Sequence, residues 1–237
     1  MENQLKLSPR LLAVARQVRR GAIGADVGTD HGYLACHLAY HHVCPKVYAS
    51  DLNRGPLEQA ARTVRECGLE GKVIPLLSDG VRELPLDEIS DIAVAGMGGD
   101  LILSIISDFR LRSSEKRLIL QPMTKAEVLR RGLYKMGFEL YRETAVRDGR
   151  FVYTVLTARY TGKNQEIDEF FAQVGLLMGK TEEEKACLNR VLSRVEKKLA
   201  GIRRSGSGET KELEQLAEMI KERILNGKGE RNPEMDG

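Results

Sequence analysis

The sequence predicts an α/β protein, in which a mostly parallel sheet has helices on both faces and a small helical unit follows. Three observations support this prediction. Short apolar segments alternate with helical ones from residue 22 to residue 136, a pattern typical of parallel strands with crossover helices. Two strand-like segments with no helix between them close the series. Beyond residue 163 the apolar pattern is purely helical.

The first predicted element is a helix over residues 8–20. Ser8 suits the N-cap because its hydroxyl can accept a hydrogen bond from a free backbone N–H, and Pro9 suits the first helical position. Apolar residues between Leu11 and Val18 recur at helical spacing and form one face. Several arginines lie elsewhere on the surface of this helix.

Seven strands are predicted between residues 22 and 160. They cover residues 22–27, 46–51, 72–77, 91–95, 117–122, 138–146 and 151–160. Four further helices are predicted at residues 33–42, 56–67, 100–108 and 125–136, and glycines follow two of them. The last two strands are joined across Asp148-Gly149 and are expected to form an antiparallel hairpin. A plain dinucleotide-binding fold would instead continue with another helix and strand.

The C-terminal third predicts an antiparallel helical hairpin. Apolar residues from Leu188 to Ile202 step by four and three residues, as in a coiled-coil seam, and a second amphipathic helix follows a Gly/Ser turn at 205–208. A leading helix is expected at 166–179. We therefore divide the chain into a ligand-binding domain (1–161), a helical hairpin domain (162–226) and a tail (227–237) expected to be disordered.

Composition excludes several classes of protein. No apolar run of about 20 residues is present, so no membrane span is expected. The N-terminus lacks the features of a signal peptide, and four unpaired cysteines suit the reducing cytoplasm. Cys36, His37, His41, His42 and Cys44 could suggest a metal site. No second ligand pair has fitting spacing, so we expect no metal.

Two basic segments stand out in a chain whose net charge is only +3. Residues 1–20 carry five basic residues and one acidic residue, and residues 185–204 carry seven and one. Such local basic surfaces suit a polyanion such as RNA. The alternative is an ordinary solvated helix surface balanced by acids at 182–184.

The candidate site lies where the predicted parallel strands end. Ligands of such sheets bind over the carboxyl ends of the strands. All five parallel strands end in acidic, glycine or amide residues, in the segments Asp26 to Gly32, Asp51, Ser78-Asp79-Gly80, Gly96 to Gly99, and Gln121-Pro122-Met123. The coincidence of these chemistries at one edge predicts a nucleotide-like ligand there.

The first turn narrows the class of ligand. It lacks the G-x-G-x-x-G spacing of dinucleotide sites and carries acids at Asp26 and Asp30. Carboxylates would repel a pyrophosphate and favour a cation. Asp51 is placed to accept hydrogen bonds from a ribose diol, and Asp79 could accept one from an adenine amine. A phosphate-free, cationic adenosyl ligand is S-adenosyl-L-methionine.

The motifs also resemble a known family. D-x-G-T-D-H-G-Y-L, A-G-M-G-G and L-Q-P-M, together with the helical hairpin, are similar to the TrmK family of bacterial tRNA (adenine-N(1))-methyltransferases, which modify the adenine at tRNA position 22. The resemblance implies a class I methyltransferase with a Rossmann-like, seven-stranded sheet whose last strand is antiparallel. It implies cofactor contacts at Asp26, Gly28, Thr29, Asp30, Gly32, Asp51, Asp79, Gly80 and Gly96.

The expected methyl transfer to adenine needs no side chain that removes a proton from the base. Ring nitrogen 1 of adenine has an in-plane lone pair, so catalysis should be mostly alignment and electrostatics. The methylated base is cationic, and Asp30 or Asp26 could stabilise its charge. Tyr33 could stack on the base. Asp30 and Tyr33 are the catalytic candidates, although both could instead only shape the turn.

The remaining candidates contact the cofactor or the tRNA. His31 is expected to shape the cofactor site rather than to transfer a proton. Met97 and Gly98 could contact the target base, although Met97 could equally be packing. Arg194, Lys197 and Lys198 could clamp tRNA. We expect a cytoplasmic monomer. An RNA-binding protein with weak catalysis and a small-molecule methyltransferase stay open as alternatives.

Overall fold

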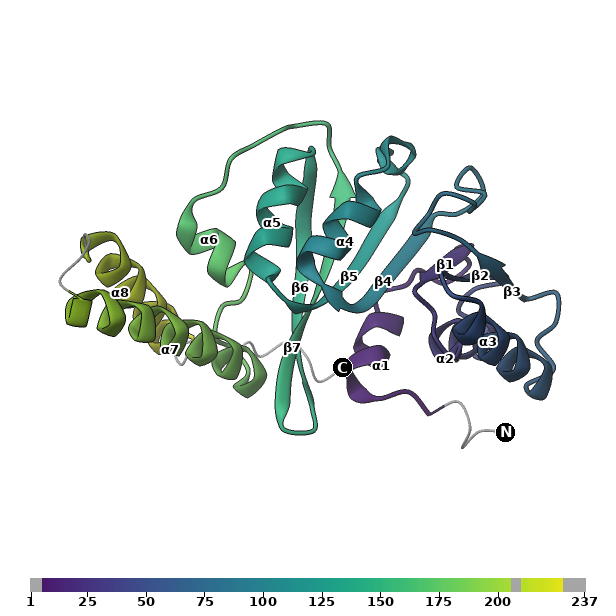
Figure 1. Ribbon diagram of the computed structural model, residues 1–237, viewed down its shortest axis with the longest axis horizontal. Coiled ribbons are helices and arrows are strands. Elements are labelled where there is room, and N and C mark those ends of the chain that lie inside the picture. The colour runs from purple at the N-terminus through teal and green to yellow at the C-terminus, as the bar shows by residue number, and fades with distance from the viewer. Residues whose placement is uncertain (1–5, 206–209, 228–237) are drawn as a thin grey trace, which may run out of the picture.

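A computed structural model describes residues 6–205 and 210–227 of the chain. It contains a seven-stranded sheet in the order β3-β2-β1-β4-β5-β7-β6 (Figure 1). The strands are β1 (Gly24–Val27), β2 (Val47–Asp51), β3 (Val73–Leu77), β4 (Asp91–Gly98), β5 (Arg117–Thr124), β6 (Phe138–Asp148) and β7 (Phe151–Tyr160). β1 to β5 run parallel, whereas β7 is antiparallel to both neighbours, β5 and β6. The predicted fold is confirmed.

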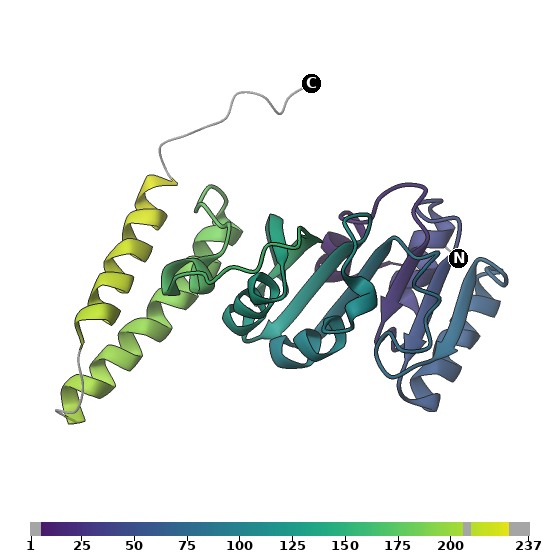
Figure 2. The same ribbon diagram turned by 90° about the horizontal axis from the view of Figure 1, so that it is seen from above.

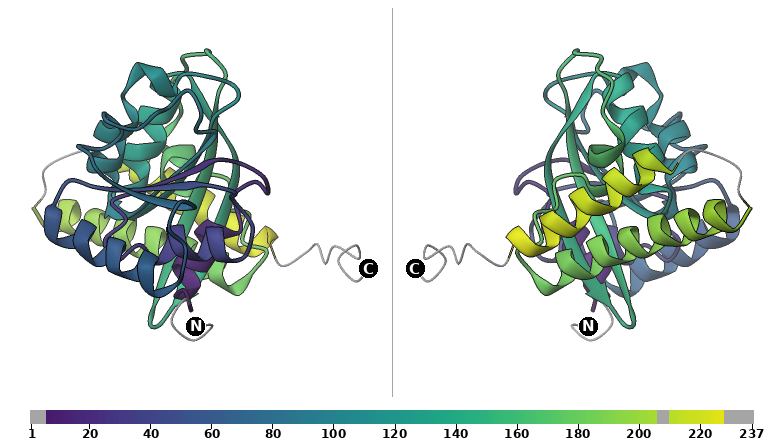
Figure 3. Two further views of the ribbon diagram at one scale, coloured as in Figure 1. Left: turned by 90° about the vertical axis from the view of Figure 1, so that its right-hand side faces the viewer. Right: turned by 90° about the vertical axis from the view of Figure 1, so that its left-hand side faces the viewer.

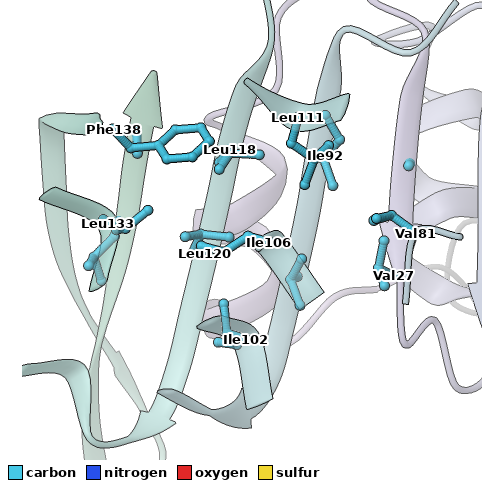
Figure 4. Close-up of a cluster of buried hydrophobic side chains, with 14 of the residues drawn as sticks. Val27, Val81, Ile92, Ile102, Ile106, Leu111, Leu118, Leu120, Leu133 and Phe138 are labelled. Carbon is cyan, nitrogen blue, oxygen red and sulfur yellow. The ribbon is translucent and has the colours of Figure 1, made fainter. Parts of the chain in front are cut away.

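Helices cover both faces of the sheet. α1 (Pro9–Ala15), α2 (Tyr33–Tyr40) and α3 (Arg54–Glu66) pack on one face, and α4 (Gly99–Ile106), the 3-10 turn η1 (Phe109–Leu111) and α5 (Ala126–Lys135) pack on the other. The strands alternate accordingly. Leu118 and Leu120 of β5 join the α4–α5 core (Figure 4). Ile119 joins the α1–α2 core on the other face. Burying each such side chain stabilises the fold by roughly 1.5–3 kcal/mol.

α1 begins as predicted but ends at Ala15 rather than at residue 20. The Ser8 hydroxyl accepts a hydrogen bond from the Leu11 N–H (3.4 Å), which confirms the cap. The early end follows from Arg19, whose backbone N–H and Nε each donate to the buried Asp91 carboxylate at 2.7 Å. This ion pair at the start of β4 draws the chain out of the helix.

The C-terminal helices form the predicted hairpin beyond the β6 edge of the sheet (Figure 2). α7 (Glu182–Ser205) and α8 (Lys211–Asn226) lie side by side (Figure 3) and bury a seam that includes Leu188, Val195 and Ile220. Val152 of β7 joins the same core. Residues 206–208 of the turn predicted at 205–208 and residues 228–237 of the predicted tail lie outside the described residues, whereas Ser205 is the last residue of α7.

The leading helix is shorter than predicted. α6 covers only Glu169–Val174, because Gly175 follows at φ 64° and ψ −139°, a conformation that ends the helix and is open mainly to glycine. The contacts made by the chain around Gly175 account for the difference.

Arg130 of α5 and Glu143 of β6 form a buried ion pair that binds this segment. Their side chains are 3% and 0% exposed, and Nη2 lies 2.5 Å from Oε1. Arg130 Nη1 also donates to the Ala172 carbonyl (2.6 Å), and the Leu176 N–H donates to Glu143 Oε2 (3.0 Å). A Cβ at Gly175 would lie 2.0 Å from that carboxylate oxygen. The pair therefore holds the start of the helical hairpin against the sheet.

Replacing Gly175 by alanine should destabilise the protein. The new methyl group would force the buried ion pair apart and strain the backbone, so we expect a loss of about 3 kcal/mol in the free energy of unfolding. Urea denaturation followed by circular dichroism measures it.

The control is Gly201→Ala near the C-terminal end of α7, where no atom lies within 4 Å of the added Cβ. That change should stabilise the protein by about 0.5–1 kcal/mol because alanine is the better helix former. Equal free energies of unfolding for the two variants would contradict the docking role of Gly175.

Candidate functional site

The carboxyl ends of β1 and β4 enclose a cavity of about 240 Å³. It is lined by Arg10, Leu11, Asp26, Gly28, Thr29, Asp30, His31, Tyr33, Leu34, Ala95, Gly96 and Met97. Seven of the residues predicted to bind cofactor or to act in catalysis therefore meet in one cavity, as does Met97, which was predicted to contact substrate.

The absence of a side chain at Gly28 keeps the cavity open between the β1–α2 turn and Met97. It has a φ of +74°, and a Cβ added there would lie 2.0 Å from Met97 Cε. The turn after β1 therefore exposes bare backbone, and the flexible thioether of Met97 lies over it. A larger residue at position 28 would close the space between the β1–α2 turn and the end of β4.

Asp26 places a carboxyl group at the floor of the cavity. It is 4% exposed and accepts a hydrogen bond from the Thr29 hydroxyl (2.7 Å). Burial raises the pKa of Asp26 from 3.8 to about 6, although the hydrogen bonds from Thr29 and the backbone N–H of Ala35 lower it in part. The charge of Asp51 raises this pKa further. A cationic ligand would relieve the burial cost of this carboxylate.

Asp51 ends β2 with its carboxylate held by the backbone. Its Oδ1 accepts from the Asn53 N–H (2.9 Å) and its Oδ2 from the Asp30 N–H (3.3 Å). Leu52, the residue after Asp51, is 62% exposed. Leu77 of β3, which pairs in register with Asp51, is 40% exposed. An acid beside two exposed apolar side chains suits a ribose joined to a flat base. These two leucines stand out only because they are exposed in the folded protein, which the sequence does not indicate, so sequence reasoning missed them.

Asp79 and Gly80 follow β3, outside the 240 Å³ cavity. Asp79 is exposed and lies 3.1 Å from Arg82. Gly80 has a φ of +63°, and a Cβ there would come within 3.3 Å of Ile105. Gly32 also does not line the cavity, and its φ of +75° lets α2 approach Ala60 of α3 closely.

Asp30, His31 and Tyr33 form the mouth of the cavity. Asp30 adopts a positive φ of 53° and directs a 71% exposed carboxylate to within 3.7 Å of His31 Nε2. The His31 and Tyr33 rings stack at a centroid distance of 5.5 Å. Tyr33 is 44% exposed. The mouth therefore offers an aromatic face and an acid to a group that enters from solvent.

The end of β4 departs from the predicted turn. The strand continues to Gly98, with an irregularity in its pairing to β5 between Ala95 and Met97. The Gly96 N–H that leaves the ladder donates instead to Gln121 Oε1 (3.0 Å). Gly98 precedes α4 and lies beside Thr124 of β5.

Arg10 is a cavity residue that sequence reasoning missed. Its Nη1 donates to the same Gln121 oxygen (2.6 Å), and Gln121 is fully buried. One amide side chain therefore connects α1 with the irregular end of β4. The two partners are 111 residues apart, and no local pattern in the sequence links them.

The predicted tRNA-binding cations lie on α7, away from this cavity. Arg194 lines a second cavity next to the end of β5. Lys197 and Lys198 are exposed, and Lys198 lines a groove between α6, α7 and α8. Arg194 and Lys198 therefore lie on different surfaces of the protein.

In residues 6–205 and 210–227, no three His, Cys, Asp or Glu side chains gather as a metal ion would require. Of the helices in the same ranges, none has both the length and the apolar content of a membrane span.

Comparison with known proteins defines the class and then the family. Residues 7–156 match the Methyltransferase domain family, so fold and site define a methyltransferase. The tRNA (adenine(22)-N(1))-methyltransferase of Bacillus subtilis (strain 168) is 34% identical over 178 residues, which are 75% of each chain. The chain therefore belongs to the tRNA (adenine(22)-N(1))-methyltransferase, or TrmK, family, as its motifs implied.

Solved structures agree with this assignment. The crystal structure of B. subtilis TrmK is similar with a TM-score of 0.77 and 28% identity, covering 94% of this chain and 98% of that one. A Streptococcus pneumoniae protein in complex with S-adenosyl-L-methionine is similar with a TM-score of 0.79 and 27% identity, covering 92% and 100%.

Neutralising Asp26 should make stability less dependent on pH. Burial raises the pKa of Asp26 in the folded protein above its value in the unfolded chain. Asp26 therefore does not lower the free energy of unfolding at low pH, where it is protonated in both the folded and the unfolded state. It lowers that free energy most above pH 6, where the buried carboxyl group is ionised. The stability of Asp26→Asn relative to wild type should therefore rise by roughly 2 kcal/mol as the pH is raised from 4 to 7.

Denaturant unfolding at several pH values measures this difference. Asp87→Asn on an exposed loop carries no burial cost and is the matched control. A constant difference between Asp26→Asn and wild type across this range would contradict a buried, destabilising carboxylate.

Proposed function

We propose that this chain transfers a methyl group from S-adenosyl-L-methionine to ring nitrogen 1 of an adenine, position 22, in tRNA. The observation that carries the proposal is the cavity of buried acid and glycine at the ends of β1 and β4. It suits a cationic adenosyl ligand and not a pyrophosphate. The name of the B. subtilis relative supports adenine and tRNA as the acceptor.

The residues of the site fit S-adenosyl-L-methionine. Asp26 offers a buried carboxylate to a cation, and Gly28 leaves the room that a Cβ would fill. Asp51 keeps acceptor positions for a ribose diol, and Leu52 and Leu77 offer apolar contact to an adenine. When bound, the cofactor supplies an electrophilic methyl group on a sulfonium sulfur.

The protein's own residues would position the acceptor. Ring nitrogen 1 keeps its lone pair at neutral pH, so no base has to remove a proton from it, and the transfer needs no metal. Tyr33 offers a half-exposed ring for stacking with a base that has left its own stack. Asp30 lies at the same mouth and would stabilise the positive charge that the base acquires.

The helical hairpin would bind the rest of the tRNA. In this proposal residues 1–161 hold the cofactor and residues 162–226 bind RNA, through cations on α7 such as Arg194 and Lys197. Such phosphate contacts add affinity but not sequence specificity. The protein would act as a monomer in the cytoplasm, where its tRNA substrate is found.

Mass spectrometry of tRNA incubated with the protein and isotopically labelled cofactor tests the activity. We expect one labelled 1-methyladenine per substrate tRNA. A protein that binds tRNA but not S-adenosyl-L-methionine would instead be an RNA-binding protein. Labelling of small molecules with no labelled tRNA would identify a small-molecule methyltransferase.

Asp51→Ala should weaken cofactor binding. The change removes a carboxylate that would accept two hydroxyl hydrogen bonds, so we expect a loss of about 1–3 kcal/mol, measured by calorimetry. Asp87→Ala, an exposed acid elsewhere, should leave the affinity unchanged. An unaltered affinity in Asp51→Ala would remove this residue from the site.

Tyr33→Ala should slow methyl transfer without weakening cofactor binding. The ring lies at the mouth of the cavity, where it would contact the base rather than the buried part of the ligand. We expect at least a tenfold lower kcat, in the range of about 10²-fold that misplacement of a reacting group causes. Tyr33→Phe, which keeps the ring, should retain most activity. Equal losses in turnover and cofactor affinity would make Tyr33 structural.

A further inference from the structure

A second cavity, of about 390 Å³, lies between the end of β5, the start of α5 and helix α7. It is separate from the cofactor cavity. Four of its lining side chains are cationic and one is acidic: Lys125, Arg130, Arg190, Arg194 and Glu127. Such a concentration of positive charge in a concave site favours an anion.

Not all of this charge is neutralised inside the protein. Lys125 pairs with Asp100, and Arg130 pairs with Glu143. Arg194 Nη2 lies 3.6 Å from Glu127 Oε2 and donates to Gln173 Oε1, but the Arg194 side chain stays 55% exposed and open to a ligand. The Arg190 Nη1 donates to a backbone carbonyl, that of Val152, at 2.8 Å. Among the residues that the structure describes, Arg190 therefore has no acidic partner to neutralise its charge.

Arg130, which lines the same cavity, has one donor without a partner in the described part of the chain. Its side chain is 3% exposed, and among the described residues its Nε has no hydrogen-bond partner. A buried donor without a partner destabilises the folded protein.

The start of α5 adds backbone donors. Lys125, Ala126 and Glu127 line the cavity, and no side chain caps this helix. Its N-cap residue, Lys125, has a φ of +56° and carries no acceptor that could take the place of a ligand. The first N–H groups of a helix together with its dipole bind anions such as phosphate.

The cavity lies one strand away from the site of methyl transfer. Met97, which lines the cofactor cavity, pairs in register with Pro122, which lines the second cavity. Neighbouring strands are about 4.8 Å apart. An RNA strand whose base enters the first cavity therefore has its backbone within reach of the second.

We propose that this second cavity binds a backbone phosphate of the tRNA next to the target adenine, with Arg190 and Arg194 as its charged ligands. The inference rests on the proposed function, because it names the part of the substrate that lies beside the methylated base. A bound phosphate on one side of the base would fix how far the base can enter the cofactor cavity.

The first experiment measures tRNA affinity in the full-length protein. Arg194→Gln should weaken binding about tenfold, as expected for one charge-assisted contact, and should lower the salt dependence by about one counterion. Lys135→Gln removes the same charge from the exposed far end of α5 and should change neither. Unchanged cofactor affinity in both variants shows that they fold.

The second experiment locates the phosphate. A series of tRNAs carries a single uncharged methylphosphonate at successive linkages around the target adenine. At one linkage this change should weaken binding to the wild type about tenfold and binding to Arg194→Gln by a smaller factor, because only Arg190 then remains as a charged ligand of the phosphate. Inorganic phosphate should compete weakly with tRNA for the wild type and not for Arg194→Gln.

Two results would overturn the proposal: wild-type tRNA affinity in Arg194→Gln, or equal methylphosphonate penalties in both proteins at every linkage. Because these are binding measurements, they decide the phosphate site whether or not methyl transfer occurs. Methyladenine formation by the wild type on unmodified tRNA is measured separately. Its absence would refute the proposed function, whereas its presence without the coupling would refute only the phosphate site.

Discussion

Two buried charges, Arg130 and Glu143, are neutralised by each other and by backbone groups of the segment that leads into the helical hairpin. Neither charge could stay buried alone, because an unpaired buried ion costs several kcal/mol. The segment around Gly175 must therefore dock in one position. α7 follows directly, so the same pair determines where Arg190 and Arg194 lie relative to the edge of the sheet.

The two cavities at that edge have opposite electrostatic character. The first has the buried Asp26 carboxylate at its floor, whereas the charged residues that line the second are four cations and one acid. β4 and β5 separate them. In the proposed function, a cationic methyl donor would bind at the first cavity and an anionic RNA backbone at the second, so that neither site would favour the other's ligand.

The sequence predicted those features that depend on local chemistry. Ser8 as a cap, the strand–helix order and the terminal hairpin could all be read from short-range pattern. Residues that the tertiary structure brings together were missed. Arg10 reaches the cavity through Gln121, and α1 ends early because Arg19 binds the distant Asp91. Leu52 and Leu77 are informative only because they stay exposed, which composition cannot indicate.

The insertion of β7 between β5 and β6 has a consequence for synthesis on the ribosome. β6 is an edge strand with β7 as its one neighbour in the sheet, yet β6 is made first. The open edge of β5, with Leu118 and Leu120 beside it, also waits for β7. The sheet can close only after Tyr160 has left the exit tunnel. Until then the nascent chain presents an unpaired, apolar edge of the kind that chaperones bind.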